Sequence, residues 1–350
     1  MSKLILVTGA SGFVASHIIY QLLQDGHRVR ATARAKKVDA LKALYSAYPS
    51  LEIVEVADIA QSQFRDALTG VDVVIHTASP LAYRVDADTL LKTAIEGTLN
   101  VLRQAEKAGV KKFVVTSSIA AVVGDPTIQG VSYKSEHWNP VTKETFVVTP
   151  ETDPFQAYSA SKTLSERAVW DWAEAHPHVD VTTICPSFIY GPFAPLFLPI
   201  APGDLSSLST NGLVYGLFTP PGAHLPSIGF VDVRDTARAH VGAALKSTVP
   251  GGTIRKRAIL ASPGGLDESK LFDLIREKRP LVGERLAGGD NIVSPVDTLD
   301  LDYEQIESFT GLKKSDYYTT EQTFLDTIDS LLEVEEYWKE QGAVAAAVAA

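Results

Sequence analysis

Cysteine is almost absent from this sequence. Its 350 residues include one cysteine, Cys185. A single cysteine cannot form an internal disulfide, and its scarcity fits a reducing compartment, so we predict a cytoplasmic protein. Cys185 follows a β-rich run, where buried packing is its expected role. No group of cysteines and histidines has the spacing of a metal site, so we expect no metal cofactor.

Basic residues and long apolar runs are also scarce. The chain has 32 lysines and arginines against 42 aspartates and glutamates, a net charge of −10. Such a chain has little overall attraction for nucleic acid or anionic membranes. No apolar run approaches the ~20 residues of a membrane span, and Leu4–Val7 is too short for a signal peptide. We therefore expect neither nucleic-acid nor membrane partners, and a frayed end at 343–350.

Short apolar runs that alternate with helical patterns make up the first half of the chain. The continuous run Leu4–Val7 is typical of a strand buried on both faces of a parallel sheet. Further strands are predicted at 29–33, 52–56, 71–75, 113–116 and 181–185, with helices between them at 14–26, 40–48, 64–68, 88–108 and 158–175. This alternation predicts an α/β fold with a doubly wound, Rossmann-type parallel sheet.

The pattern changes after Pro186, where prolines become frequent up to Pro226. A strand at 229–231 follows, and Asp232 can cap a helix over 233–246. We predict a nucleotide-binding domain over 1–186 plus 227–250. A smaller C-terminal substrate lobe would comprise 187–226 and 251–342. The weakly periodic stretch of about forty residues before Tyr158 is expected to form a wall or lid.

A glycine-rich turn follows the first strand. Gly9 permits a tight turn and Gly12 lets the backbone approach a pyrophosphate, while the helix beginning at Phe13 directs its free N–H groups at that phosphate. The spacing is Gly-x-x-Gly-x-x-Ala, which departs from the Gly-x-Gly-x-x-Gly form. The residues predicted to contact a dinucleotide here are Gly9, Ala10, Ser11, Gly12, Phe13 and Val14.

The end of the second strand indicates which dinucleotide is bound. An enzyme that uses NAD places an acidic residue there to bind the ribose 2′-hydroxyl. This chain instead has Arg34, Lys36 and Lys37, and no acid before Asp39. A guanidinium can bind a 2′-phosphate in a bidentate fork, so we predict that Arg34 and Lys37 select NADPH/NADP+.

A tyrosine and a lysine four residues apart form the chemically distinctive pair. Tyr158 and Lys162 lie on one face of the predicted helix. A nearby ammonium favours the ionised form of a tyrosine, which makes the hydroxyl a usable proton donor at neutral pH. The pair alone is weak evidence, but it occurs together with the glycine turn and with Ser118 at the end of a strand.

Together these motifs resemble the short-chain dehydrogenase/reductase superfamily in its extended, two-lobed form. Within it, the chain resembles fungal NADPH-dependent aldehyde and ketone reductases of the methylglyoxal type, which are related to plant dihydroflavonol reductases. The resemblance fades after about residue 240. It rests on Gly9–Val14, Ala33–Arg34, His76–Pro80, Thr116–Ser118, Trp138–Pro140, Tyr158–Lys162, Pro186–Pro192 and Val231–Asp235.

The resemblance implies specific roles for the residues. Tyr158 would protonate the carbonyl oxygen, Lys162 would assist it and bind the nicotinamide ribose, and Ser118 would hold the carbonyl oxygen in line. Asn100 would either support a proton-relay water or be an ordinary polar helix residue. Cofactor contacts are also expected from Asp58, Ile59, Ala78, Pro186, Ile189 and Asn211.

An apolar pocket for the small-molecule substrate is expected beside these residues. It would be lined by Leu81, Tyr83, Ile119, Val123, Phe155 and Phe188. No lysine or arginine occurs between Pro186 and Ser227. These features favour a neutral aldehyde or ketone over a charged substrate.

Other readings of the motifs stay open. A dihydroflavonol or cinnamoyl-type reductase is one, although the segment Pro154–Ala157 lacks the aromatic motif of plant cinnamoyl-CoA reductases. A sugar-nucleotide epimerase or dehydratase is another, and Arg34 argues against the tightly bound NAD such enzymes use. A regulatory protein with an inactive site is disfavoured because Tyr158 and Lys162 are both present. We expect a monomer or a homodimer.

Overall fold

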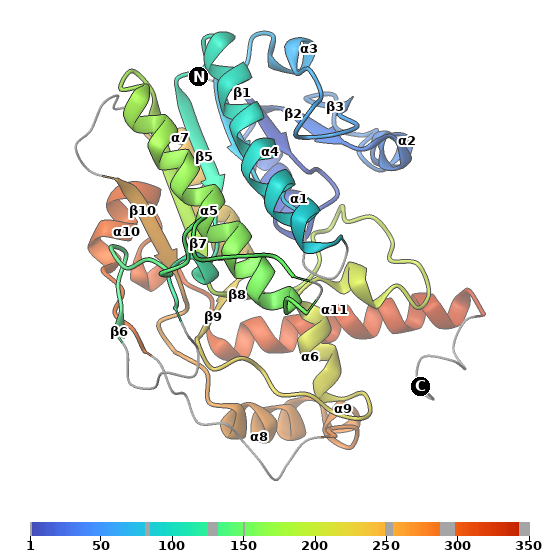
Figure 1. Ribbon diagram of the computed structural model, residues 1–350. Helices are drawn as coiled ribbons and strands as arrows, with labels where there is room; N and C mark the ends of the chain where they lie inside the picture. Colours follow the sequence, from blue (N-terminus) through green and yellow to red (C-terminus); the bar gives the residue numbers. More distant parts are fainter. Residues whose placement is uncertain are drawn as a thin grey trace.

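A seven-stranded parallel sheet forms the centre of the molecule (Figure 1). The computed structural model describes residues 2–80, 85–124, 132–149, 151–248, 255–287 and 298–342. The strand order is β10-β7-β5-β4-β1-β2-β3, and every pair is parallel. These strands are β1 (Leu4–Thr8), β2 (Arg28–Ala33), β3 (Leu51–Glu55), β4 (Val73–His76), β5 (Lys112–Thr116), β7 (Asp180–Pro186) and β10 (Lys256–Leu260). The predicted doubly wound fold is confirmed.

Side-chain alternation along each strand builds two separate cores, one on each face of the sheet. In β1, Ile5 and Val7 point into one core, whereas Leu4 and Leu6 point into the other. Because neighbouring side chains of a strand point to opposite faces, one apolar run serves both layers. The first core includes α1 (Phe13–Gln24), α2 (Ala35–Leu44), α7 (Val233–Leu245) and α10 (Tyr303–Thr310). The second includes α3 (Arg65–Leu68), α4 (Ala87–Lys107) and α5 (Pro154–Ala175).

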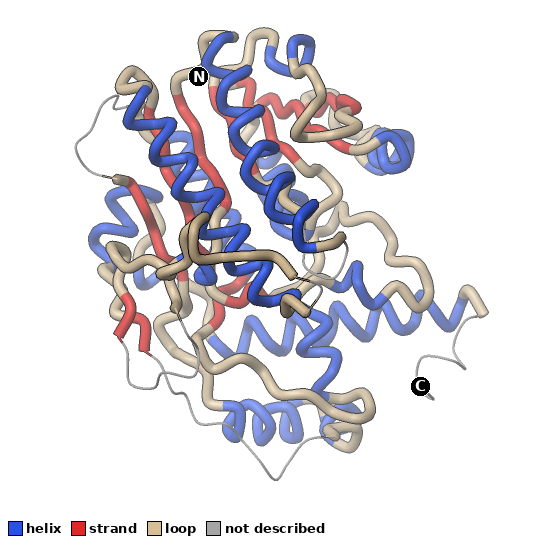
Figure 2. The backbone as a smooth tube through the Cα atoms, viewed as in Figure 1, coloured by secondary structure: helices blue, strands red, loops and turns tan. Residues whose placement is uncertain are grey.

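A third core belongs to a smaller lobe beyond the carboxyl ends of the strands (Figure 2). Its helices are α6 (Asn211–Leu217), α8 (Glu268–Lys278), α9 (Pro280–Gly283) and α11 (Thr320–Glu340). Two short strands, β8 (Phe188–Tyr190) and β9 (Phe230–Asp232), pair in parallel and connect this lobe to the main sheet. A second small pair joins β6 (Ser132–Tyr133) to β11 (Thr298–Leu299). Single turns of 3-10 helix lie at η1 (Ile119–Ala121), η2 (Leu205–Leu208) and η3 (Lys314–Asp316).

The predicted boundary between the two lobes is wrong for part of the C-terminal region. Residues 256–260 form β10, which pairs with β7 as an edge strand of the main sheet. Ile306 of α10 and the following Leu312 pack in the same core as α1. These segments therefore pack with the main sheet and not with the smaller lobe, because β10 extends the sheet beyond β7. The tail at 343–350 lies outside the described residues.

The second helix begins earlier than its sequence pattern predicts. We expected a helix over 40–48, whereas α2 spans Ala35–Leu44 and is capped by Arg34. The buried residues of α2 are Val38 and Leu41, three positions apart on one face. The first three residues of α2 are solvent-exposed, and two of them are basic. The hydrophobic pattern therefore does not reveal where the helix begins.

In the part of the chain that the structure describes, no helix combines the length and apolarity needed to cross a membrane.

Candidate active site

The carboxyl ends of the central strands bring the predicted site residues to one edge of the sheet. Thr8 at the end of β1 is in register with Thr32 of β2 on one side and with His76 of β4 on the other. The turns that follow these strands carry Gly9, Arg34 and Ala78. Ligands of open α/β sheets bind at this edge, so the fold places the candidate site where the strand order reverses.

The turn after β1 forms a backbone cradle for an anion. Gly9 has a φ of +79°, and the Gly12 N–H donates to its carbonyl at 2.9 Å. A Cβ added at Gly9 would come within 3.2 Å of the Ala78 backbone, so glycine is required for this close approach. Gly12 is exposed and is the N-cap of α1, while Ala10 and Phe13 are buried. The first N–H groups of α1 are thus available to a phosphate.

A buried network holds the end of β4 against this turn. The Thr8 hydroxyl accepts hydrogen bonds from the backbone N–H groups of Thr77 and Ala78, both at 3.1 Å. It lies 2.9 Å from His76 Nδ1, and His76 Nε2 lies 3.1 Å from the Thr98 hydroxyl. Because Thr98 donates its proton to the Ala94 carbonyl, it accepts from Nε2, and Nδ1 accepts from Thr8. His76 is therefore a neutral packing residue that orients the turn.

The environment of His76 also reports the position of Lys162. Burial, and to a smaller extent the positive charge of Lys162, lower the pKa of His76 to about 3. The ammonium of Lys162 is thus close enough to the end of β4 to act on the His76 ring.

Helix α5 carries the Tyr158–Lys162 pair. Asp153 caps its first turn by accepting from the N–H groups of Phe155 and Gln156, and Pro154 occupies the first helical position. Lys162 Nζ lies 5.6 Å from the centre of the Tyr158 ring, as the four-residue spacing predicts. Tyr158 is half-buried whereas Lys162 is buried, so the hydroxyl-bearing residue is the one open to a substrate.

Ser118 reaches the same region from the end of β5. It has extended backbone angles, and its hydroxyl accepts from the Ala120 N–H at 3.2 Å as the N-cap of η1. The η1 turn packs directly against α5. The structure therefore brings together the elements that carry Ser118, Tyr158 and Lys162, which lie far apart in the sequence.

The basic residues after β2 are exposed. Arg34 and Lys37 lie at the start of α2, and neither side chain has a hydrogen-bond or ion-pair partner among the described residues. Asp58 follows β3 and is exposed, with a carboxylate oxygen accepting from the Ala60 N–H at 2.7 Å. Ile59 beside it is half-buried and packs on the core of α4.

Asn100 has a structural role. Its amide donates to the carbonyls of Ile59 and Ser62, at 3.0 and 3.1 Å, and its oxygen accepts from Gln104. The amide group thus holds the loop that follows β3. Of the two roles left open for Asn100, these bonds favour a structural residue over the support of a relay water.

Three further cofactor predictions lie at the ends of β7 and β8. Pro186 is buried at the end of β7, and Ile189 is half-buried in β8 opposite Val231. Asn211 begins α6, has no exposed surface, and donates to the Gly191 carbonyl at 2.8 Å. The contact of Asn211 with the cofactor stays a prediction: its amide N–H fixes the turn after β8, and its side-chain oxygen has no hydrogen-bond partner among the described residues.

The predicted substrate residues divide into three groups. Phe155 is exposed and stacks on Tyr158, with 6.4 Å between ring centres, and Phe188 is half-buried against the core of the smaller lobe. Ile119 and Val123 are buried in a small cluster beneath η1. Leu81 and Tyr83 lie outside the described residues. Phe155 is thus in contact with a predicted catalytic side chain.

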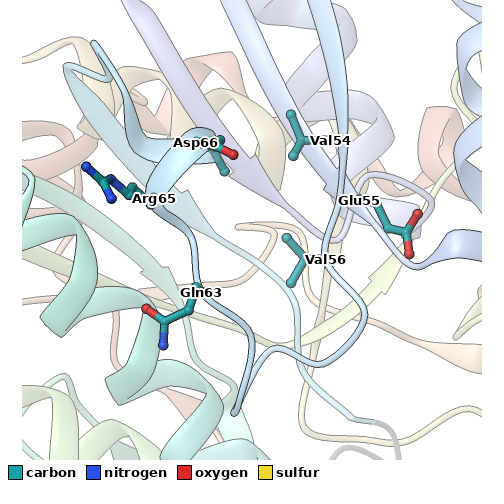
Figure 3. A pocket seen from close by; sticks show the side chains of 7 residues that line it. Val54, Glu55, Val56, Gln63, Arg65 and Asp66 are labelled. Atoms are coloured by element: carbon teal, nitrogen blue, oxygen red, sulfur yellow. The ribbon is translucent and has the colours of Figure 1, made fainter.

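Two surface pockets flank this edge of the sheet. One, of about 540 Å³, lies outside β3 and is lined by residues of β3 and α3, including Glu55 and Arg65 (Figure 3). None of the predicted cofactor residues lines it. The other, of about 720 Å³, lies between the start of α4 and the first turn of α5, where Pro154 and Ala157 form its wall. The second pocket includes Ala157, the residue before Tyr158 in α5, and is the better candidate for substrate entry.

Sequence reasoning missed the residues that support the site. Thr8 accepts a hydrogen bond from the Ala78 N–H and so holds the turn after β4. Glu166 accepts a hydrogen bond from the Ser117 hydroxyl and so holds the segment that carries Ser118. Asp153 could have been found, because an aspartate directly before a proline at a helix start is a capping signal. Among the described residues, no group of three or more histidine, cysteine, aspartate or glutamate side chains could hold a metal ion.

Comparison with known proteins shows the family to which the chain is similar. Residues 5–254 match the NAD dependent epimerase/dehydratase family. Aldehyde reductase 2 of Sporidiobolus salmonicolor is 33% identical, over 79% of this chain and 82% of its own length. A cinnamoyl-CoA reductase of Medicago truncatula is 34% identical, over 72% and 75%.

The solved structures that match include yeast methylglyoxal/isovaleraldehyde reductase complexed with NADPH. That structure has a TM-score of 0.78 and 26% sequence identity, and the alignment covers 95% of this chain and 99% of that one. The agreement extends through the C-terminal region, where the sequence motifs alone had faded. The chain belongs to the NAD dependent epimerase/dehydratase family, the extended short-chain dehydrogenase/reductases.

Proposed function

We propose that this protein is an NADPH-dependent carbonyl reductase that reduces aldehydes and ketones to alcohols. The observation that carries the proposal is the Tyr158–Lys162 pair on α5, packed beside the turn that begins at Ser118. The glycine turn after β1 opens at the same edge of the sheet. Proton donor and cofactor cradle thus face one site.

The residues present fit NADPH. The turn from Gly9 to Gly12 leads into α1, whose first N–H groups can bind a diphosphate, and the first turn of α1 contains no acidic residue to repel it. Arg34 is exposed, unpaired among described residues, and at the strand end that faces an adenosine ribose. The similarity to a reductase solved with NADPH supports the same choice.

The chain's own residues then carry the proton and position the carbonyl. NADPH, when bound, supplies the hydride that reduces the carbonyl carbon. Tyr158 donates its hydroxyl proton to the carbonyl oxygen, which completes the alcohol. Ser118 holds that oxygen by a hydrogen bond, and Lys162 stabilises the tyrosinate left behind.

A neutral substrate with an apolar arm suits the surroundings of Tyr158. Phe155 stacks on Tyr158, and the pocket lined by Pro154 and Ala157 of α5 also includes the apolar side chains of Leu90 and Val148. The described residues that line it include two aspartates and no basic side chain. An anionic sugar nucleotide would find no counter-charge there, so we expect a branched aldehyde or aryl ketone to be preferred.

An epimerase or dehydratase is the alternative from the same family. Such an enzyme retains its dinucleotide and shows no net consumption of free cofactor. The similarity to an aldehyde reductase and the exposed Arg34 favour the reductase. A cinnamoyl-type reductase is less favoured, because the residues before Tyr158 lack the plant motif.

The test is to supply the purified protein with NADPH and a panel of carbonyl compounds. The panel should contain branched aldehydes, α-dicarbonyls, β-keto esters and aryl ketones, with UDP-glucose as the comparison. We expect NADPH oxidation equal in moles to the alcohol formed. Turnover of the sugar nucleotide with no reduction of any simple carbonyl would overturn the proposal.

A further inference from the structure

A buried ion pair lies directly behind the candidate active site. Glu166 of α5 and Arg257 of β10 are joined through Glu166 Oε1 and Arg257 Nε at 2.8 Å and through Oε2 and Nη2 at 3.1 Å. Their side chains are 1% and 3% exposed. Glu166 follows Tyr158 and Lys162 at intervals of four residues, so the three side chains lie on one face of α5.

The carboxylate of Glu166 connects this face of α5 to two strands. Oε2 accepts a hydrogen bond from the Ser117 hydroxyl at 2.8 Å, at the end of β5. Oε1 accepts from the Thr183 hydroxyl at 2.7 Å, in the middle of β7. One helix residue therefore fixes α5 against β5, β7 and β10 together.

Arg257 extends the connection to the chain that follows Ser118. Its guanidinium donates to the carbonyls of Ala121, Ser135 and His137, and it stacks on Trp138 with 3.9 Å to the ring centre. Ala121 is the last residue of η1, the turn that Ser118 caps. The ion pair thus contacts the Ser118 segment at two points: Glu166 binds Ser117 and Arg257 binds Ala121.

We propose that Glu166 is a positioning residue, which sets Ser118 relative to Tyr158 through its hydrogen bond from Ser117. Ser117 and Ser118 are consecutive residues, so a hydrogen bond that fixes the Ser117 hydroxyl also fixes the backbone from which the Ser118 side chain projects. A buried ion pair is seldom needed for stability alone, and its directional bonds suit a role in alignment. This inference rests on the proposed reductase function.

A matched pair of substitutions separates positioning from general stability. Ser117→Ala and Thr183→Val each remove one hydroxyl donor from the same buried carboxylate. Only the first breaks the connection to the segment that carries Ser118. We expect Ser117→Ala to lower kcat about tenfold, since a misplacement near 1 Å can cost about 10². Thr183→Val should stay within about twofold of the wild type.

The accompanying measurements are the Kd for NADPH by fluorescence titration and the melting temperature. Both variants should bind NADPH as the wild type does, and Ser117→Thr, which keeps the hydroxyl, should restore kcat. Equal kcat for Ser117→Ala and Thr183→Val would overturn the positioning role. A wild-type protein that binds NADPH but reduces no carbonyl would instead refute the proposed function, so the two failures are distinguishable.

Discussion

Tyr158 is the residue on which the proposed chemistry depends. It is half-buried, stacks on Phe155, and has the Lys162 ammonium 5.6 Å from its ring centre. We predict that Tyr158→Phe lowers kcat by roughly 10²–10⁴, the usual contribution of a general acid. NADPH should bind to the variant as before, because the hydroxyl acts on the substrate carbonyl.

The measurement is single-turnover reduction together with a binding titration. A loss of less than about tenfold would place the proton donor elsewhere in the site. Loss of NADPH binding would mean that the hydroxyl supports the cofactor.

Arg34 governs cofactor choice in our proposal. It caps α2, is exposed, and has no partner among the described residues that would have to be released. A hydrogen bond to a charged group contributes about 1.5–3 kcal/mol, roughly ten- to a hundredfold in affinity. Arg34→Ala should therefore raise the KM for NADPH by about that factor and leave the KM for NADH nearly unchanged.

Lys37→Ala is the matched control for Arg34→Ala. Lys37 is also exposed but offers a single point charge, so we expect a smaller effect that fades with added salt. Steady-state kinetics with both cofactors would decide between the roles. Equal losses with NADH and NADPH in Arg34→Ala would contradict binding of the 2′-phosphate.

Local spacing was enough to predict the Tyr158–Lys162 pair and the glycine turn, because each is formed within a single helix or a single turn. The supporting bonds could not be predicted in this way. Glu166 meets Ser117 at a separation of 49 residues and Arg257 at 91. No periodicity in the chain relates such positions, so only the folded sheet reveals them.

At the scale of single elements, the first turn of α5 lies directly before Tyr158 and supports it. Asp153 accepts from two N–H groups of that turn, at 3.0 and 2.9 Å. Loss of an aspartate N-cap costs about 0.5–2 kcal/mol. We predict that Asp153→Ala lowers kcat/KM roughly tenfold, because fraying reaches Phe155 and loosens the tyrosine.

The control is Asp302→Ala, which removes the equivalent cap of α10. Asp302 accepts from the Gln305 N–H at 2.9 Å, and α10 packs on α7 and β10, the edge strand of the sheet. Both variants should lower the melting temperature, but only Asp153→Ala should affect catalysis. If the two variants lost activity equally, the cap of α5 would have no special bearing on Tyr158.

Element prediction succeeded where burial produced a clear pattern. Leu99, Leu102 and Ala105 of α4 are buried as their helical spacing predicts. The start of α2 was misplaced because Ala35, Lys36 and Lys37 are exposed and leave no apolar signal. The capping role of Asp232 for α7 was predicted correctly, since its side chain accepts from the Arg234 N–H.

Over the whole molecule, assignment of residues to lobes depends on contacts distant in sequence. β10 pairs with β7 across more than seventy positions, so a division by sequence order assigned it to the wrong lobe. Arg234 of α7 binds Asp326 of α11, which ties the main sheet to the smaller lobe. Contacts of this kind join the two lobes.

Three buried histidines make similar long-range connections. His17 Nε2 contacts the Pro192 carbonyl, His76 joins Thr8 to Thr98, and His240 Nε2 contacts the Thr116 hydroxyl. Burial lowers the pKa of His17 and His240 to about 4 and that of His76 to about 3. All three are therefore neutral in the folded protein at neutral pH.

These lowered pKa values predict that the fold weakens in mild acid. Above pH 6.5 the histidines are neutral in both states and contribute no pH dependence. Below it, the unfolded chain binds three protons that the folded chain does not, so stability falls until the folded pKa values are reached. Each histidine costs about 1.4 kcal/mol per pH unit in this window. Asp235 acts in the opposite sense, because burial raises its pKa to about 6 and protonation then favours the folded state.

The net expectation is a loss of about 3 kcal/mol in the free energy of unfolding between pH 7.5 and pH 5.5. Urea unfolding at these two pH values measures it.

His76→Gln should be less stable than the wild type at pH 7.5, because it disturbs the bonds to Thr8 and Thr98. Its loss of unfolding free energy on acidification should nevertheless be smaller by about 1.3 kcal/mol. The difference between the two pH dependences of the free energy of unfolding reports the protonation of His76 alone, because all other titratable groups are the same in both proteins. Parallel pH dependence in the wild type and His76→Gln would mean that His76 is protonated within the folded protein, and its proposed neutral bonding to Thr8 would then be wrong.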